Sequence, residues 1–292
     1  MKYLFLLAVL FLVSLPIRAQ TPLTITSEPN AIVWVDEIRR GTTDASGKLS
    51  LTKVSAGRHA VRVRASGFKE ATVPLIPGRR TLEVKLLPTT DEAELLFQQA
   101  ETAREKARDD PSLEKAADLY REALKLRAAM PAAHVGLARV LMELNDFKEA
   151  HAAIEAARRA KPAYAEASAV EGRIYREEAF SDDAIRSFRR AIREGGGVQP
   201  EAYVGLAKVL EDKGQFAEAI VSYQKALAQL SDSEPVIYQL LGAAYEKAEK
   251  KKEAIAAYEK YLQLAPNGSY AGAIRSILDQ LKREAAGEQI IP

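Results

Sequence analysis

The sequence predicts a multidomain chain in which a small all-β sandwich precedes an all-α superhelix, a solenoid of helical repeats. Two observations carry this prediction. Between residues 20 and 88, apolar and polar residues alternate with a period of two, which is typical of half-buried strands. From residue 89 onward, apolar residues recur with helical spacing, and the pattern repeats at intervals of 34 or 35 residues.

Residues 1–19 have the features of a secretory signal peptide. Lys2 supplies a positive start, and the 12-residue apolar run that follows ends before Pro16. This run is too short to span about 30 Å of hydrocarbon comfortably, and Ala19 stands where a signal peptidase cuts. We expect cleavage after Ala19 and an exported protein, periplasmic or extracellular, with no membrane span afterwards. An uncleaved N-terminal anchor is the alternative.

Composition and charge narrow the range of functions. The 292 residues include no cysteine, three histidines and one tryptophan, which excludes disulfides, thiol nucleophiles and zinc–thiolate sites. No nucleophile or metal motif is present, so we expect no enzyme, no metal site and no cofactor. Residues 20–88 carry a net charge of +5 and residues 89–292 a net charge of −5. Neither part has the basic clustering of a nucleic-acid binder. The opposite signs allow a contact between the two parts, which salt screening makes weak.

The β-region should contain six short strands separated by turn-forming residues. The expected strands are 24–26, 31–35, 49–51, 60–64, 71–73 and 81–86. This spacing is typical of a β-sandwich. A sandwich of this size has a small core, which we expect to be filled by Val33, Trp34, Val61, Val63 and Phe68.

Two features of this region could be mistaken for functional sites. Residues 41–48 faintly resemble a phosphate-binding loop, but five residues separate the glycines where four are needed, and a strand follows instead of a helix. We interpret this segment as a hairpin loop. His59 has no second ligand nearby in the sequence, so we interpret it as an ordinary strand residue rather than a metal ligand.

A longer motif in the same region resembles the PEGA domain. The matching residues are Ser27-x-Pro29-Asn30-Ala31-x-Val33-x-Val35-Asp36, Gly41-x-Thr43, Gly57-x-His59-x-Val61-x-Val63 and Gly67-Phe68. The resemblance covers nearly all of residues 20–88, although the Pro-x-Gly-Ala motif is shortened by one residue and lacks its glycine. It implies a non-catalytic binding or spacer module of bacterial surface and envelope proteins. A carboxypeptidase-regulatory-like sandwich, also non-enzymatic, is the alternative.

The helical region contains five copies of one pattern. Its reference positions are Ala116, Ala150, Ala184, Ala219 and Ala254, which are 34, 34, 35 and 35 residues apart. A large side chain follows each of them four residues later, and a small residue precedes the last four by twelve. We therefore expect pairs of antiparallel helices that cross closely at the small residues, with the large side chain packed between neighbouring pairs. Prolines are expected to open three of the repeats, at Pro131, Pro200 and Pro235.

This pattern resembles the tetratricopeptide repeat (TPR), most closely in Tyr238-x2-Leu241-Gly242-x2-Tyr245, Ala254-x3-Tyr258 and Pro266. Residues 89–286 should form five TPR-like helix pairs with a C-terminal capping helix at 269–286, followed by a tail at 287–292. The first pair is atypical, because residues 109–111 are expected to lengthen its internal turn. The third copy is degenerate, with Glu171 where leucine is usual.

The resemblance to TPR proteins implies a concave groove that binds a peptide of a partner protein. Counting from the start of each first helix, a basic row and an acidic row should line this groove. The candidate groove residues are Arg139, Arg173, Arg176, Lys208, Glu143, Glu177, Glu211 and Glu246. Such rows suit a polar or acidic peptide, and solvated repeat surface is the alternative. The carboxylate-clamp variant of the family needs asparagine at the ninth position, which is absent here, so recognition of chaperone tails is disfavoured.

The sequence thus predicts an exported, non-catalytic scaffold protein. Its repeats would bind a protein or peptide partner, and its β-domain would contact a cell-envelope component or act as a spacer. The alternatives are an envelope-attached structural or polysaccharide-binding protein and an accessory subunit of an enzyme complex. One tryptophan and few grouped aromatic residues make sugar stacking weak.

Overall fold

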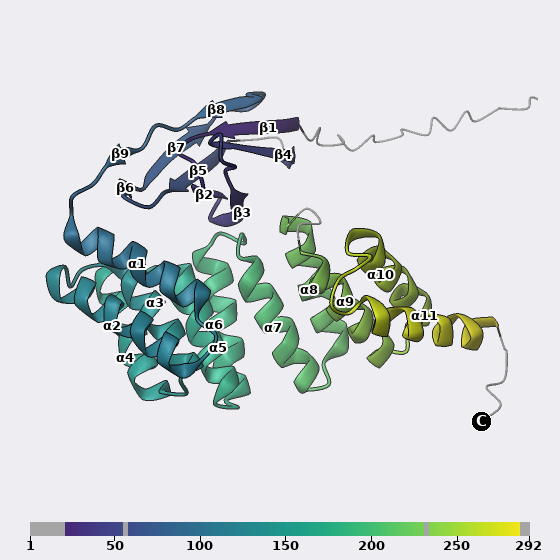
Figure 1. Cartoon of the computed structure of the whole chain (residues 1–292). Coiled ribbons are helices and arrows are strands. Elements are labelled where there is room, and N and C mark those ends of the chain that lie inside the picture. Colours follow the sequence, from purple (N-terminus) through teal and green to yellow (C-terminus); the bar gives the residue numbers. More distant parts are fainter. Residues whose placement is uncertain (1–20, 55–57, 231–233, 287–292) are drawn as a thin grey trace, which may run out of the picture.

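A computed structural model of the chain describes residues 21–54, 58–230 and 234–286. The predicted signal peptide and the tail at 287–292 lie outside these residues. The strands occupy the first part of the chain and the helices the rest, and the β-region lies over one side of the helical array (Figure 1). The strands are β1 (Thr21–Thr26), β2 (Ile32–Val35), β3 (Ile38–Thr42), β4 (Lys48–Val54), β5 (His59–Arg64), β6 (Phe68–Lys69), β7 (Ala71–Leu75), β8 (Thr81–Glu83) and β9 (Leu87–Pro88).

The β-region consists of two main sheets around one core. One sheet has the order β4-β1-β8, in which β1 and β8 run parallel, and the other has the order β3-β2-β5-β7 and is antiparallel. Alternate residues of β1, β2 and β5 point into the shared core, where Ile25, Val33, Val61 and Val63 are fully buried. This arrangement follows from the period-two pattern, because successive side chains of a strand point to opposite faces.

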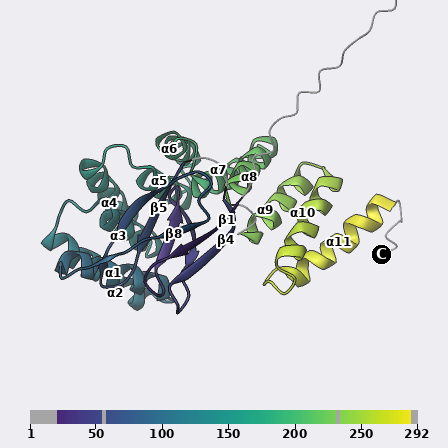
Figure 2. The same cartoon turned by 90° about the horizontal axis from the view of Figure 1, so that it is seen from above.

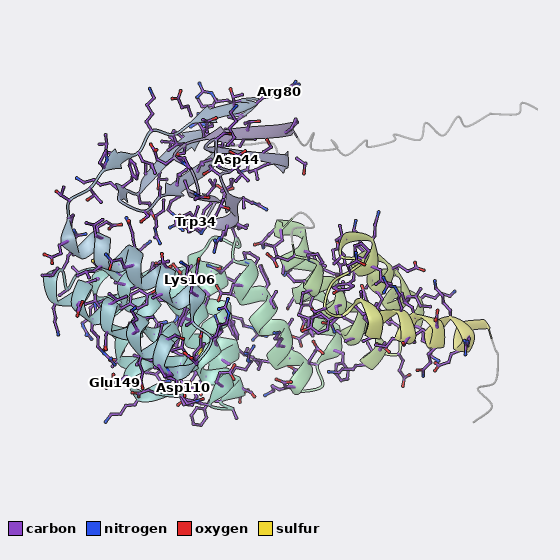
Figure 3. All side chains as sticks on the ribbon, viewed as in Figure 1. Trp34, Asp44, Arg80, Lys106, Asp110 and Glu149 are labelled. Carbon is purple, nitrogen blue, oxygen red and sulfur yellow. The ribbon has the colours of Figure 1, made fainter. Side chains whose placement is uncertain are left out.

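The expectation that Trp34 belongs to this core is wrong. Trp34 is half-buried, and its ring lies under the guanidinium groups of Arg62 and Arg64, at 4.1 and 5.3 Å. Since Val33 and Val35 on either side point inward, strand alternation places Trp34 on the outer face of the sheet. Figure 3 shows Trp34 on the side of the β-region that faces the helices.

The interpretation of residues 41–48 as a hairpin loop is also wrong. Strand β3, which was not among the six expected strands, pairs with β2 at one edge of the four-stranded sheet, whereas β4 belongs to the other sheet. The segment therefore crosses from one sheet to the other. Its tight turn is closed by Asp44, whose side chain accepts hydrogen bonds from the backbone N–H groups of Ser46 and Lys48.

Ten helices form five antiparallel pairs, and an eleventh follows them in the described part of the chain. They are α1 (Glu92–Lys106), α2 (Asp110–Leu126), α3 (Pro131–Glu143), α4 (Phe147–Ala160), α5 (Ala165–Glu177), α6 (Ser181–Glu194), α7 (Pro200–Asp212), α8 (Phe216–Leu230), α9 (Pro235–Lys247), α10 (Lys251–Leu264) and α11 (Ala271–Ala286). Proline occupies the first turn of α3, α7 and α9, where its missing N–H group costs nothing.

The prediction that residues 109–111 lengthen the first internal turn is wrong. Three residues separate the two helices in every pair, including the first. The extra length is taken up by α2, which begins early because Asp109 and Ser112 form a reciprocal capping box and Pro111 is tolerated in the first turn. In the four later turns the middle residue adopts a positive φ, whereas the first turn does without one.

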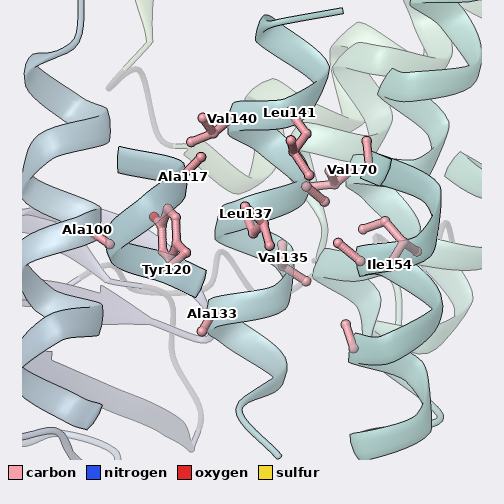
Figure 4. Packing of buried hydrophobic residues seen from close by; sticks show 14 of the residues in the cluster. Ala100, Ala117, Tyr120, Ala133, Val135, Leu137, Val140, Leu141, Ile154 and Val170 are labelled. Atoms are coloured by element: carbon pink, nitrogen blue, oxygen red, sulfur yellow. The ribbon is translucent and has the colours of Figure 1, made fainter. Parts of the chain in front are cut away.

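The large residue of each second helix packs as the repeat pattern predicts. Figure 4 shows Tyr120 of α2 between α1 and α3. A Cβ atom added to Gly136 of α3 would lie 2.4 Å from the Tyr120 ring. Phe188 of α6 is held in the same way between Gly172 of α5 and Gly205 of α7. Small residues on first helices thus admit an aromatic ring that joins one helix pair to the next.

Helix α11 closes the C-terminal end of the array. Its buried residues Ile274, Leu278 and Leu281 pack in one cluster with Tyr258 and Tyr261 of α10. Among the described residues, no helix is long and apolar enough to cross a membrane.

Candidate functional site on the inner face of the helical array

The first helices of successive pairs form the inner face of the array. Neighbouring first helices are in direct contact: α1 with α3, α3 with α5, and α5 with α7. In the sequence, one second helix lies between the two helices of each such contact. Close approach of the first helices curves the array toward their side. All eight candidate groove residues lie on helices α3, α5, α7 and α9, but the structure places them in three different environments.

In the first environment, the cations are already neutralised by the protein itself. Arg139 of α3 donates to Glu166 at 2.9 Å and to Glu201 at 3.3 Å, and its side chain is only 15% exposed. Burial by itself lowers its pKa, but the charges of Glu201 and Glu166 outweigh this and raise the pKa. Arg173 of α5 donates to the same Glu201 at 3.1 Å. This ladder of ion pairs links the starts of α5 and α7 to the neighbouring helices.

The second environment is an open hollow farther along the inner face. Its lining residues are Arg176, Lys208, Glu211, Asp212, Tyr223 and Leu240. It has a volume of about 310 Å³. Lys208 is half-buried, and its pKa is lowered by burial and by the nearby positive charges of Arg176 and Arg173. Arg176 is paired with the adjacent Glu177. An anionic group entering this hollow would relieve the repulsion between these cations.

The third environment contains two of the four residues of the predicted acidic row, and these two support the fold. Glu211 accepts a hydrogen bond from the Tyr223 hydroxyl at 2.6 Å and one from Lys247 at 3.0 Å. Glu246 accepts in the same way from the Tyr258 hydroxyl. These tyrosines are buried, and burial raises their pKa, so each hydroxyl keeps its proton and needs an acceptor. Glu143, by contrast, is exposed, and its own copy has Ile154 at the tyrosine position.

The sequence contained a signal for this pairing that the row pattern did not capture. Glutamate stands twelve residues before Tyr223 and before Tyr258. The copies that carry Ile154 or Phe188 at the tyrosine position have no hydroxyl, and they have methionine or arginine in place of the glutamate. In these two copies the glutamate supplies the acceptor that the buried hydroxyl needs, whereas Tyr120 of the first copy donates to Glu101 of α1.

Replacing Glu211 with alanine is expected to lower the free energy of unfolding by about 1–2 kcal/mol, because the Tyr223 hydroxyl would be left buried without an acceptor. Chemical denaturation of the full chain measures this change. Glu143→Ala is the matched control and should change stability by less than about 0.5 kcal/mol. Equal losses in the two variants would contradict a structural role for Glu211.

The histidines and the degenerate repeat have structural partners. His59 lies 2.5 Å from Asp36, and His151 lies 2.7 Å from Glu178. No group of three or more potential metal-ligating side chains occurs within residues 21–54, 58–230 and 234–286. Glu171, where the repeat pattern has leucine, is buried and receives hydrogen bonds from side chains of the helices on either side.

Comparisons with known proteins agree on the fold of the helical region. Residues 107–174 and 199–267 each match a family model described as tetratricopeptide repeat. PilF of Pseudomonas aeruginosa is 16% identical with a TM-score of 0.57, covering 68% of this chain and 87% of that one. PilW, a type IV pilus biogenesis factor, is 18% identical with a TM-score of 0.56, covering 67% and 86%. A thermophilic TPR protein of Thermus thermophilus is 20% identical with a TM-score of 0.53, covering 65% and 98%.

A search of curated proteins gave no match. At these identities the solved structures show a shared fold, and the two family matches lie in the helical region, one before α6 and one after it. Residues 107–174 and 199–267 of this chain are tetratricopeptide repeats, the class of module that mediates protein–protein interactions, and the helical region as a whole is TPR-like.

Proposed function

We propose that this protein is an exported, non-catalytic scaffold that binds a partner peptide in the open hollow of its inner face. The observation that carries the proposal is the half-buried Lys208, which lies beside Arg176 with the apolar side chain of Leu240 at the same hollow. A charged group held next to an apolar contact fits a peptide side chain better than a small ion. The preferred peptide would place a carboxylate against Lys208 and an aliphatic residue against Leu240.

In this proposal, the signal peptide is removed after Ala19 and the β-region acts as a PEGA-like spacer or envelope contact. The polysaccharide alternative is less favoured, because the ring of Trp34 is covered by Arg62 and Arg64 and is therefore poorly placed to stack on a sugar. The positive charges of Arg176 and Lys208 would select against strongly cationic peptides at the hollow.

A photo-crosslinking experiment on the mature protein in its own envelope fraction tests this proposal. A benzoyl-phenylalanine at position 240 should give a discrete crosslinked partner, and the same group at position 221, an exposed site on α8, should not. The double variant Arg176→Glu/Lys208→Glu should lose the product at least tenfold, because it reverses both charges at the hollow.

Arg186→Glu/Arg189→Glu is the matched control for that experiment. Both arginines lie on α6 and are more than half exposed, so the same change in net charge is made away from the hollow. The control should keep the crosslinked product. Identical products from positions 240 and 221, or retention of the product in Arg176→Glu/Lys208→Glu, would contradict binding at the hollow.

A further inference from the structure

The β-region is held against the first helix of the array by a buried glutamine. Gln98 of α1 donates to the carbonyl oxygen of Phe68 and accepts from the N–H group of Gly67, both at 2.9 Å. Its side chain also donates to Glu94 one turn earlier. Because these bonds satisfy the polar atoms of a buried amide, they fix the end of the β-region that lies nearest α1.

Away from the Gln98 contact, arginine side chains on the outer face of the four-stranded sheet point toward the helices. The guanidinium group of Arg64 lies 4.7 Å from the ring centre of Phe97 and 3.8 Å from the Glu101 carboxylate, both on α1. Arg62 and Arg64 are also close enough to Glu166, at the start of α5, to help lower its pKa against the opposing effect of burial. In the view from above, the β-region lies over the helices of the N-terminal half (Figure 2).

The tip of the β2–β3 hairpin makes three more contacts with the helices. Ile38 is buried, and it packs in the cluster formed by α5–α10 instead of the core of its own sandwich. Arg39 donates to Glu105 of α1 at 2.9 Å, and Arg40 donates to the carbonyl oxygen of Gln229 near the end of α8 at 3.0 Å. Burial lowers the pKa of Arg40. An aliphatic residue followed by two arginines thus occupies this part of the array.

The contacts between the β-region and the helices are of a kind that is readily broken. Apart from Ile38, they consist of polar, ionic and cation–π contacts, and the Arg39–Glu105 pair is substantially exposed on both sides. Exposed ion pairs contribute little to stability, and polar interfaces between domains commonly permit relative motion. The net charges of +5 and −5 on the two parts of the chain also mean that salt weakens the contact.

We infer that the β-region is a removable intramolecular occupant of the helical array between α1 and the end of α8. The surface beneath it is a second interaction site, distinct from the hollow at Lys208. It accepts an extended basic segment in which an aliphatic residue is followed by two arginines, because that is the chemistry of the segment that now covers it. A partner peptide of this kind binds only when the β-region moves away.

Distance measurements on the full mature chain test whether the β-region can be displaced. The sequence has no cysteine, so Thr72→Cys on β7 and Glu155→Cys on α4 give two unique sites for spin labels, both exposed. The parent chain should give one narrow distance distribution. Ile38→Asp, and independently Arg39→Glu/Arg40→Glu, should broaden it and shift it to longer distances. Arg79→Glu/Arg80→Glu changes a second, exposed arginine pair and should leave it unchanged.

Binding of a probe peptide then tests the second site. The probe is a fluorescent peptide copying residues 32–42, and its control carries serine in place of Ile38, Arg39 and Arg40. The two opened variants should bind the probe at least tenfold more tightly than the parent chain or Arg79→Glu/Arg80→Glu, and they should not bind the serine peptide. Adding Arg176→Glu/Lys208→Glu should leave this binding unchanged, which separates it from the hollow. Unchanged label distances in both opened variants, or equal probe binding by all chains, would overturn the inference.

Discussion

Replacing Glu171 with alanine is expected to lower the free energy of unfolding by about 3 kcal/mol, the largest effect of any single substitution considered for this chain. The Glu171 carboxylate of α5 accepts two hydrogen bonds from Arg158 of α4, at 2.5 and 2.9 Å, and one from Ser187 of α6 at 2.7 Å. Arg190 of α6 also pairs with it. Removing the carboxylate would leave two partly buried guanidinium groups without their counter-charge between three packed helices.

The same carboxylate should make stability depend on pH. Burial alone raises the pKa of Glu171, but the hydrogen bonds from Arg158 and Ser187 and the charges of Arg158 and Arg190 outweigh it and lower the pKa. A lowered pKa in the folded state means that the stabilisation is complete above the ordinary glutamate pKa of about 4.3 and is lost as the pH falls through the folded value. The stability difference between the parent chain and Glu171→Gln should therefore shrink at low pH.

Urea denaturation at pH 7, 5 and 3 measures both effects. Glu218→Ala is the matched control, because Glu218 of α8 forms only a long, exposed pair with Arg189 at 3.6 Å. It should change stability by less than about 0.5 kcal/mol at pH 7. A Glu171→Ala variant as stable as Glu218→Ala, or a stability difference that does not depend on pH, would show that the charge cluster does not support the third repeat.

Replacing Gly205 with valine is expected to destabilise the protein by about 2–3 kcal/mol through overpacking. A Cβ atom at this position of α7 would lie 2.3 Å from Cζ of Phe188, and Phe188 is fully buried and already pressed against Gly172 on its other side. The ring therefore has no room to withdraw, so α6 and α7 must separate.

A rescue variant and a control variant test whether overpacking causes the destabilisation by Gly205→Val. Phe188→Leu combined with Gly205→Val should recover part of the loss, so that the two substitutions together cost less than their sum in a double-mutant cycle. Gly272→Ala in α11 is the control, because nothing lies within 4 Å of the added Cβ atom. Its higher helix propensity should raise stability by about 0.5–1 kcal/mol. Strict additivity of the two substitutions would contradict the proposed close contact.

The candidate site was predictable from sequence only in part. The repeat register puts Arg176 and Lys208 on the same side of two neighbouring first helices, because helical periodicity decides which residues share a face. In the structure both residues line the hollow. The register could not reveal that Arg139 is neutralised by Glu166 and Glu201, since those partners come from two later repeats. The row pattern also treated Glu211 as a free ligand, whereas the buried Tyr223 hydroxyl uses it.

The sequence by itself determined the helix pairs and the small-to-large packing within the array. Each of these depends on spacing within a short window, where the geometry of one helix or strand sets the pattern. Only the tertiary structure decided that the outer face carrying Trp34 lies toward the helices and that Ile38 is buried among residues of distant helices, from α5 onward. Such contacts depend on how two separately patterned surfaces meet, through charge, shape and one apolar side chain, and no local periodicity encodes that.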